Sequence, residues 1–454
     1  MSVGIVFTQA ARRKLRTRLA RRLAADRMSL EAKLREIEHK LKQVFPNGRA
    51  VVVQDLHSGF RERSEELILL VELTESADDD GVYVVKLGPE SKLAKELAGW
   101  RDCRPAGLRH DLVLMTVEER REEVNGSLIA LVYTDAQQLI GVDETIHLEK
   151  AMLDGALLGV PTPASVADAL FQLYERLGLL MYRTSYVDDP AHPGYQFLLN
   201  RLDQRLDENL QLWEAESGPA FDCLTAASTF TDMAPFRQHF RDPASFFRYL
   251  ARISATNASL AASLVPRILR GHGHGDLHGR NVLVGRVGDR ILWPAVFDYG
   301  DMGRDNIIAW DFVKMETEFK IRAYPRVFSS VTTVPTFVPE VLAFEKELFE
   351  KTEECRNSCR WPASSAAATP RDRLGWLLLR LRQLADTHLG TNLNRSRDWL
   401  TEYYFLLAVY GLNSVRFHNL TSIEFLGAYL SAGTACARFL YDREALAPAG
   451  VTAP

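Results

Sequence analysis

One segment of the sequence, at 271–281, is rich in glycine and histidine, and an apolar run follows it. Both contain side chains whose oxygen atoms could bind a metal or accept a proton. Asp276 and Asn281 are five residues apart, and Asp298 ends the predicted second strand of a hairpin. Phosphoryl transfer from ATP needs a carboxylate for the proton of the attacking hydroxyl, oxygen ligands for Mg²⁺ and a cation that braces the phosphates. The spacing predicts that these three side chains face one cavity and serve that chemistry.

The order of these residues is similar to that of a known family. The run His-Gly-Asp-Leu-His-Gly-Arg-Asn (274–281), followed by Phe-Asp-Tyr-Gly (297–300), resembles the aminoglycoside phosphotransferase and choline kinase branch of the protein-kinase-like superfamily. With Val-Lys-Leu-Gly-Pro (85–89) it also resembles bacterial phosphotransferase-like domains associated with ternary-complex systems. The resemblance implies a two-lobed protein-kinase-like fold, with ATP and Mg²⁺ as cofactors.

The resemblance also implies a role for individual residues. Asp276 would be the catalytic base, His274 would orient its loop, and Asn281 and Asp298 would bind Mg²⁺. Asp311 resembles a structural aspartate on the next helix. Only about eight residues separate Asp298 from that helix, too few for the segment on which protein kinases place a peptide. A small-molecule acceptor is therefore expected.

A lysine in the N-terminal part supplies the expected cation. Lys86 ends the third predicted strand, and Glu96 lies on the helix after it; protein-kinase-like folds use such a pair to bind the α- and β-phosphates. Glu90 is the alternative partner, and Glu96 is preferred from its helix face. Ser58 and Gly59, between the first two strands, are predicted to bring backbone N–H groups to phosphate, with an ordinary hairpin as the alternative.

The hydrophobic pattern predicts an α+β protein with two lobes. Residues 46–135 form the nucleotide-binding N-lobe, a small five-stranded antiparallel sheet with one helix at 90–100; its strands are expected at 50–54, 67–73, 82–86, 112–117 and 127–133. Residues 136–454 form a large, mainly helical C-lobe that contains the catalytic loop at 272–301. Its helices are expected at 165–182, 195–213, 243–253, 307–319, 338–352, 371–387 and 399–410.

The first 45 residues have a composition of their own. Residues 1–45 carry 12 Lys and Arg against 4 Asp and Glu, with apolar residues at helical spacing, which predicts a basic helical arm. The arm either packs on its own domain or binds a partner protein. The whole chain has a net charge of −4 and five cysteines, and no apolar run approaches the ~18 residues of a membrane helix. We expect a cytoplasmic protein that binds neither a membrane nor a specific nucleic acid.

Two other functions fit parts of the sequence. In the segment 272–278, three histidines and one aspartate occupy every second position. This pattern resembles the His-x-His-x-Asp-His motif of metallo-β-lactamase-type hydrolases with one inserted residue. Such a metal site needs further ligands, and only two histidines follow in the sequence. A nucleotide-binding scaffold without turnover, within a bacterial multiprotein signalling or conflict system, is the second alternative. The main expectation is a Mg-ATP-dependent phosphotransferase that acts on a hydroxyl of an unidentified small molecule.

Overall fold

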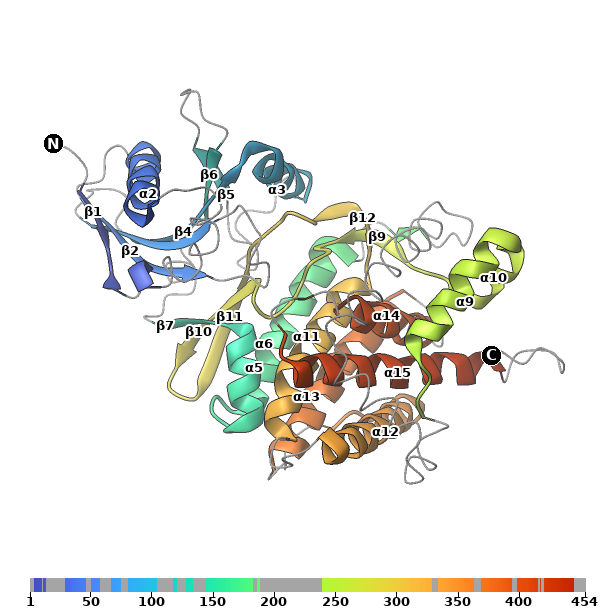
Figure 1. The fold of residues 1–454 in the computed structure, drawn as a ribbon. Coiled ribbons are helices and arrows are strands. Elements are labelled where there is room, and N and C mark those ends of the chain that lie inside the picture. The colour runs from blue at the N-terminus through green and yellow to red at the C-terminus, as the bar shows by residue number, and fades with distance from the viewer. Residues whose placement is uncertain are drawn as a thin grey trace. The chain divides into compact units, whose positions relative to one another are not determined.

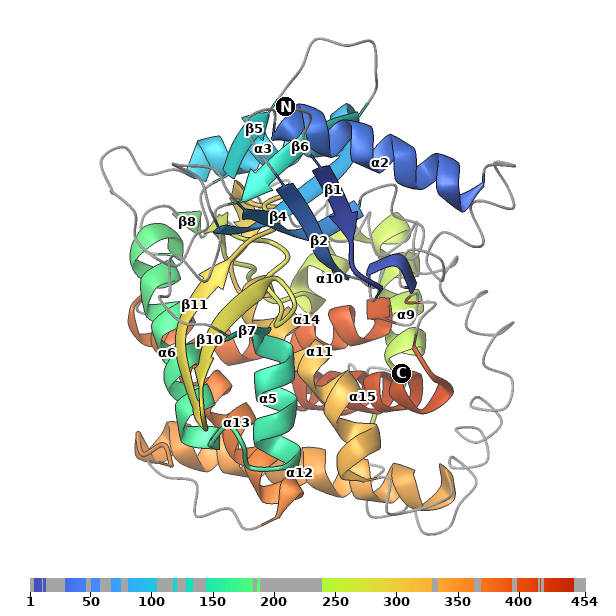
Figure 2. The same ribbon diagram turned by 90° about the vertical axis from the view of Figure 1, so that its left-hand side faces the viewer.

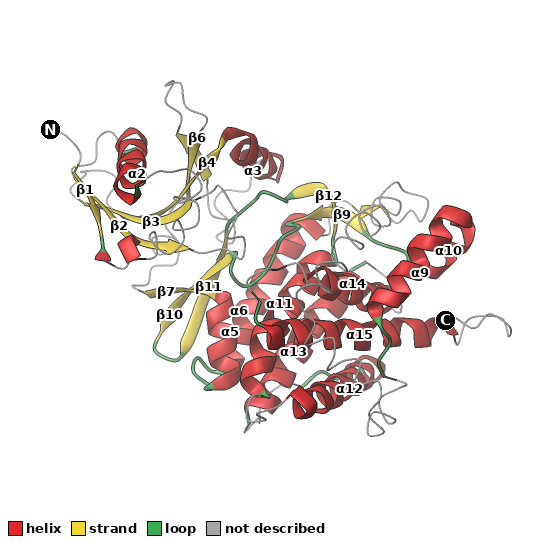
Figure 3. Ribbon diagram, in the orientation of Figure 1, coloured by secondary structure: helices red, strands yellow, loops and turns green. Residues whose placement is uncertain are grey.

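The computed structural model is a mixed α/β chain with two compact units (Figures 1 and 2). Unit 1 comprises Met1–His147, Arg280–Val287 and Leu292–Met302, and unit 2 comprises Leu148–Gly279, Gly288–Ile291 and Gly303–Pro454. Strands dominate the first unit and helices the second (Figure 3). The residues that the structure describes are 4–9, 11–13, 29–45, 50–57, 67–74, 81–103, 117–120, 128–133, 144–182, 186–187, 239–328, 334–362, 369–393, 398–414, 417 and 420–444.

Unit 1 is built on a six-stranded sheet with the order β1-β2-β3-β4-β6-β5. Its strands are β1 (Gly4–Phe7), β2 (Ala50–His57), β3 (Leu67–Thr74), β4 (Gly81–Pro89), β5 (Val117–Arg120) and β6 (Leu128–Tyr133). The prediction of a five-stranded antiparallel sheet is wrong in one respect, because β1 adds a sixth strand that runs parallel to β2. The other strand pairs are antiparallel, so the sheet is mixed.

The extra strand comes from the segment that was predicted as a helical arm. Parallel neighbours need a crossover connection, and α2 (Leu30–Val44) lies between β1 and β2 in the chain. Ser29 caps this helix by accepting a hydrogen bond from the backbone N–H of Ala32 at 3.1 Å. One core joins the apolar face of α2 to the sheet; it includes Ile37, Leu41, Val44, Val53, Leu69, Val71 and Val85. A strand of four residues is too short to show its alternation in the sequence.

A helix and a hairpin complete unit 1. The helix α3 (Glu90–Cys103) follows β4 directly, and β7 (Glu144–His147) pairs with β10 (Val282–Val287). The strand β10 forms the predicted hairpin with β11 (Arg290–Val296). Gly288 has a φ of +62° in the turn between them, a conformation that glycine adopts without steric cost.

Unit 2 contains α5 (Leu148–Leu157), α6 (Pro163–Leu177), η1 (Gly178–Tyr182), α9 (Pro243–Thr256), α10 (Ala258–Leu264), α11 (Trp310–Val327), α12 (Val334–Ser358), α13 (Pro370–Ala385), η3 (Asp386–Thr391), α14 (Asp398–Ser414) and α15 (Ser422–Glu444). Three short strands, β8 (Tyr186–Val187), β9 (Arg270–Gly273) and β12 (Gly303–Ile307), form a small sheet. The helix α11 contacts α5, α13, α14 and α15, and every residue from Asp311 to Ile321 is buried (Figure 1). This helix is therefore enclosed on all its faces.

Most predicted helices of unit 2 are present, with shifted ends. The prediction at 195–213 lies outside the described residues. The helix α15 was not predicted, because its buried residues run without interruption from 426 to 433 and give no one-sided stripe. Among the described residues, none of the helices combines the length and the apolar character needed to cross a membrane.

Candidate functional site

A buried lysine connects a strand, a helix and a distant loop within unit 1. Lys86 lies on β4, and its Nζ donates to Glu96 Oε2 at 2.6 Å and to Asp298 Oδ1 at 3.0 Å. A buried ammonium group is stable only where carboxylates compensate its desolvation, so the two carboxylates fix the position of the lysine. The structure thus brings together three of the residues that the sequence singled out.

The position of Glu96 follows from the phase of α3. Glu96 shares the buried face of this helix with Leu93 and Trp100, because residues three and four apart lie on one side. Glu90, the alternative partner, is exposed at the first position of the helix. Tyr133, at the end of β6, also donates a hydrogen bond to Glu96. This tyrosine was missed in the sequence, because its position beside Glu96 follows from the pairing of β4 with β6.

Asp298 has an unusual backbone conformation. Its φ of +66° lies in the left-handed region, which few residues other than glycine occupy. Aromatic packing holds the neighbours on both sides, since the ring of Phe297 lies 6.2 Å from that of Tyr133 and the ring of Tyr299 stacks on Trp100 at 5.1 Å. Such conformations persist where the surroundings enforce them, and they concentrate at functional sites. The backbone therefore supports Asp298 as a functional residue.

Gly99 permits a close approach between α3 and the segment after Asp298. A Cβ atom at Gly99 would lie 2.5 Å from the carbonyl oxygen of Tyr299 and 3.0 Å from that of Met302. Only a residue without a side chain fits there. The helix that carries Glu96 and the loop that carries Asp298 are therefore held together by direct backbone packing as well as through Lys86.

Asn281 is buried at the base of the hairpin in the same unit. Its carbonyl oxygen accepts a hydrogen bond from the backbone N–H of Phe297 at 3.0 Å. Because Asp298 directly follows Phe297, this bond places the two predicted Mg²⁺ ligands at the same end of the hairpin. The Asp298 side chain is 28% exposed, so its carboxylate is accessible to solvent.

In unit 2 the loop that carries Asp276 is anchored to the first turn of α11. The Asp311 carboxylate accepts hydrogen bonds from the backbone N–H groups of His274 at 2.9 Å and Gly275 at 2.8 Å, and from the Tyr182 hydroxyl at 3.0 Å. Burial raises the pKa of Asp311, although His274 and these hydrogen bonds act in the opposite direction. Asp311 therefore fixes the backbone on which Asp276 lies.

Positively charged and titratable groups surround the carboxylate of Asp276. Lys314 Nζ lies 2.7 Å from Oδ1, and His278 Nε2 lies 3.8 Å from Oδ2. The ring of His274 accepts a hydrogen bond from the backbone N–H of Asp276 at 3.3 Å. Burial alone would raise the pKa of Asp276, but Lys314, His278 and His274 together hold this pKa well below its ordinary value. The carboxylate is therefore ionised at neutral pH.

Two residues of this cluster were missed in the sequence, Lys314 and Glu318 on α11. Glu318 Oε2 lies 3.9 Å from His278 Nδ1, and its other oxygen accepts a hydrogen bond from the Tyr410 hydroxyl at 2.8 Å. Both residues follow Asp311 at helical spacing, by three and by seven positions. That spacing was the signal that could have found them.

The predicted site residues that the structure describes are divided between the two units. Ser58 and Gly59 lie outside the described residues. Lys86, Glu96, Asn281 and Asp298 belong to unit 1, whereas His274 and Asp276 belong to unit 2.

The alternative of a dinuclear metal hydrolase gains no support from the described side chains. Among them, no three His, Cys, Asp or Glu residues are grouped so that they could hold a metal ion. The alternating run at 272–278 therefore does not form the ligand cluster that such a hydrolase needs.

No family model matches this sequence, and no curated protein matches it. Among solved structures, a glucosamine kinase is similar in two crystal forms. Crystal form B has 14% identity and a TM-score of 0.36, with 90% of this chain and 97% of that chain covered. Crystal form A has 12% identity and a TM-score of 0.34, with 88% and 92% covered. TM-scores this low establish neither a common fold nor a common substrate.

Proposed function

We propose that the chain is a Mg-ATP-dependent phosphotransferase with a protein-kinase-like fold, which phosphorylates a hydroxyl of a small-molecule acceptor. The observation that carries this proposal is the buried Lys86, which pairs with both Glu96 and Asp298. Asp298 comes 212 residues after Lys86 in the chain, is partly exposed and has a left-handed backbone. A lysine with only a structural role has no need of a second, solvent-accessible carboxylate.

The donor set fits ATP and Mg²⁺. Asn281 and Asp298 offer amide and carboxylate oxygens, which Mg²⁺ binds in combination with phosphate oxygens and water. Lys86 lies beside one of these oxygens, where its positive charge suits the phosphates next to the metal. Bound Mg²⁺ would neutralise the negative charge that develops on the transferred phosphoryl group.

Each residue then has one task. Lys86, fixed by Glu96, holds the α- and β-phosphates, and Asn281 and Asp298 bind the metal. Asp276 orients the acceptor hydroxyl and takes its proton as the new O–P bond forms, while the bond to the β,γ-bridging oxygen breaks and ADP leaves. The ionised state of Asp276 suits this role, because only the carboxylate form accepts a proton.

A nucleotide-binding scaffold could share the residues of unit 1. It would have no use for a loop aspartate that is held ionised and partly open to solvent, as Asp276 is. The cluster around Asp276 therefore favours turnover over binding alone.

The test combines phosphoryl transfer with nucleotide binding. The full chain is incubated with [γ-³²P]ATP, Mg²⁺ and pools of small molecules that carry hydroxyl groups, and ADP binding is measured by calorimetry with and without Mg²⁺. We expect transfer of label to an acceptor, and loss of the Mg²⁺-dependent part of ADP binding in Asp298→Asn. Asparagine tolerates the left-handed backbone, so this variant changes the charge and keeps the fold.

Asp301→Asn is the matched control, because Asp301 is exposed nearby in the chain and pairs with Lys95 at 2.9 Å. This control should bind ADP as the unmodified protein does. Binding without transfer or hydrolysis would identify the scaffold instead. Undiminished Mg²⁺-dependent binding in Asp298→Asn would contradict the metal assignment.

A further inference from the structure

Lys314 reaches from α11 to the loop that carries Asp276. Its Nζ donates to the carbonyl oxygen of Gly275 at 2.6 Å and to Asp276 Oδ1 at 2.7 Å. The lysine is buried, whereas the Asp276 side chain is 28% exposed. Because the two acceptors belong to adjacent residues, the ammonium group fixes the carboxylate relative to its own backbone and leaves one side of it accessible.

Aromatic rings flank this lysine. Nζ lies 5.8 Å from the ring centroid of Trp310 and 5.6 Å from that of Tyr410. The two rings contact each other edge to face, with their centroids 5.3 Å apart. They exclude water from one side of the ammonium group and stabilise its charge through cation–π attraction. The interaction of Lys314 with Asp276 is stronger than in water for the same reason.

We propose that Lys314 is a positioning residue: it fixes the carboxylate of Asp276 in the orientation that reaches the acceptor hydroxyl. This inference rests on the proposed function and deepens it. Serine/threonine protein kinases place a lysine two positions after the catalytic aspartate, and this chain has His278 there. In this chain the lysine beside Asp276 comes from α11.

Other charged and titratable groups also face Asp276. His274 and His278 of the same loop contact it directly, while Asp311 and Glu318 on α11 contact the loop backbone and His278. Lys314 makes the largest charge contribution that lowers the pKa of Asp276 against the effect of burial. Without it, the pKa of Asp276 should rise.

The first experiment is a pH profile of kcat in Lys314→Met and Lys314→Arg. The unmodified protein should keep its turnover down to the pH at which it unfolds. Lys314→Met should lose about tenfold per pH unit below the raised pKa of the base, so that its acid limb moves to higher pH. Lys314→Arg retains the charge and should restore the original profile. A purely structural role would instead lower kcat equally at every pH.

Lys320→Met is the matched control, because Lys320 is buried on the same helix and pairs with Glu316 at 2.7 Å. It should lower the melting temperature and leave the acid limb in place. If Lys314→Met does not fold, Lys314→Gln provides the same comparison with a neutral side chain that can still donate a hydrogen bond. An acid limb that stays in place in the folded neutral variant overturns the inference.

A second measurement does not depend on activity. The carboxyl groups of aspartate are labelled with ¹³C and titrated by NMR, and the Asp276 signal is assigned by its loss in Asp276→Asn. Titration of Asp276 at higher pH in the Lys314 variant supports the positioning role, and unchanged titration overturns it. If the titration moves but no form of the protein turns over ATP, the proposed function fails and the positioning role of Lys314 stands.

Discussion

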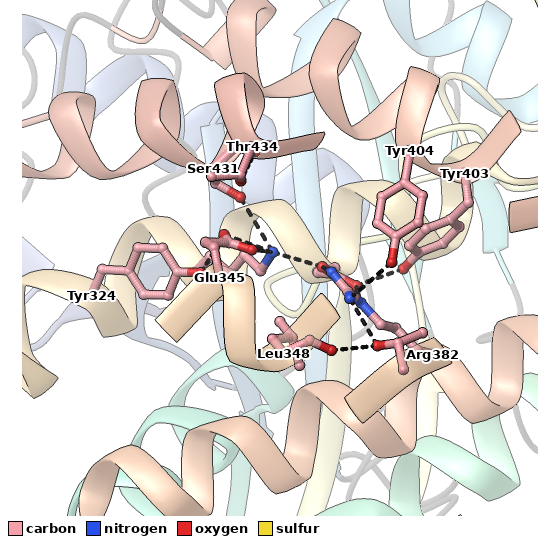
Figure 4. Close-up of polar contacts among 11 residues, drawn as sticks. Tyr324, Glu345, Leu348, Arg382, Tyr403, Tyr404, Ser431 and Thr434 are labelled. Carbon is pink, nitrogen blue, oxygen red and sulfur yellow. Dashed lines mark hydrogen bonds and ion pairs between the residues drawn. The ribbon is translucent and has the colours of Figure 1, made fainter. Parts of the chain in front are cut away.

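The helix α11 carries two sets of buried charges in unit 2, and they differ in how completely their partners enclose them. In the first, Lys314 pairs with Asp276, whose side chain remains 28% exposed. In the second, Glu316 and Lys320 meet Arg382 and Glu345 from neighbouring helices; we call these four residues the α11 network (Figure 4). No member of the α11 network is more than 5% exposed.

The α11 network is balanced in charge and rich in hydrogen bonds. Arg382 binds Glu316 through two nitrogens, at 2.7 and 3.1 Å, and Lys320 Nζ lies 2.9 Å from Glu345. Hydroxyl groups satisfy further atoms: Tyr403 donates to Glu316, Tyr324 donates to Glu345, Thr352 accepts from Arg382 and Ser431 accepts from Lys320. Figure 4 shows the hydroxyl groups of Tyr324, Tyr403 and Ser431 pointing into the network.

This difference distinguishes charged side chains that stabilise the fold from a charged side chain that is positioned to react with a substrate. A closed, neutral network gives each charge a permanent partner and leaves no room for a ligand. The Asp276 carboxylate is held in place by a lysine and remains open to solvent, which suits a group that must act on a substrate. The α11 network and the Lys314–Asp276 pair both contain buried charges. They differ in the solvent exposure of the carboxylate and in how many partners each charge has.

The largest expected effect belongs to the open cluster. Asp276→Asn removes the proton acceptor while keeping the shape of the side chain, so turnover should fall about 10²–10⁴-fold. ADP affinity should stay nearly unchanged. Release of ADP in a coupled assay measures turnover, and calorimetry measures binding.

Asp305→Asn is the control for this prediction, because Asp305 is an exposed aspartate on β12 that pairs with Arg270. It should turn over at the original rate. Turnover of Asp276→Asn within tenfold of the unmodified protein would remove the distinction between the two clusters, since neither would then act on substrate.

The next effect concerns stability and belongs to the closed network. Arg382→Met leaves the buried Glu316 without its principal partner, which should reduce the free energy of unfolding by about 3–5 kcal/mol. Replacing both residues, as Arg382→Met with Glu316→Leu, removes the pair as a unit and should recover most of that loss. Urea unfolding followed by circular dichroism measures both variants.

An exposed ion pair calibrates the same experiment. Lys351 pairs with Glu347 at 2.6 Å on the surface of α12. Lys351→Ala should cost no more than about 0.5 kcal/mol, because water screens such pairs. An equally small loss of unfolding free energy in Arg382→Met would contradict this prediction. It would show that burial of the α11 network does not increase its contribution to stability.

The smallest effect expected of the α11 network is a dependence of stability on pH. Burial alone would raise the pKa of Glu316, but Arg382 and Lys320 lower it from 4.5 to about 2. A carboxyl group with a lowered pKa contributes stability that is fully present above its unfolded pKa and is lost as the pH falls toward the folded one. This contribution, on the order of 3 kcal/mol, should disappear as the pH falls from 4.5 toward 2.

The measurement compares urea unfolding of the unmodified protein and of the double Arg382 and Glu316 variant at several acidic pH values. The unmodified protein should lose stability more steeply as the pH falls. Parallel curves for the two proteins would show that Glu316 does not titrate with a lowered pKa.

The sequence predicted the parts of the site that depend on local pattern. The phase of one amphipathic helix was enough to choose Glu96 over Glu90, and the structure pairs Lys86 with Glu96. The spacing of Asp276, Asn281 and the hairpin after them singled out Asp298, although its contact with Lys86 joins residues 212 positions apart. The roles of these residues in catalysis stay predictions.

Features that depend on tertiary pairing could not be predicted. Lys314 and Asp276 are 38 residues apart, and Tyr133 and Glu96 are 37 apart. The helical spacing after Asp311 marks Lys314 as a candidate, but its contact with Asp276 depends on the tertiary structure. The strand β1 was missed because its four residues show no period, and α15 because its apolar residues surround the helix. Periodicity identifies an element with two different faces; it gave no signal for β1, which is very short, or for α15, whose apolar residues surround the helix.

The division of the chain into units has a practical consequence for protein engineering. Unit 1 is assembled from three separate stretches, and the last of them ends at Met302. A fragment cut at His147 would keep Lys86 but would lack Asp298 and the strand that pairs with β7. A simple N-terminal expression fragment would therefore expose an unpaired strand and leave a buried lysine with half of its compensating charge.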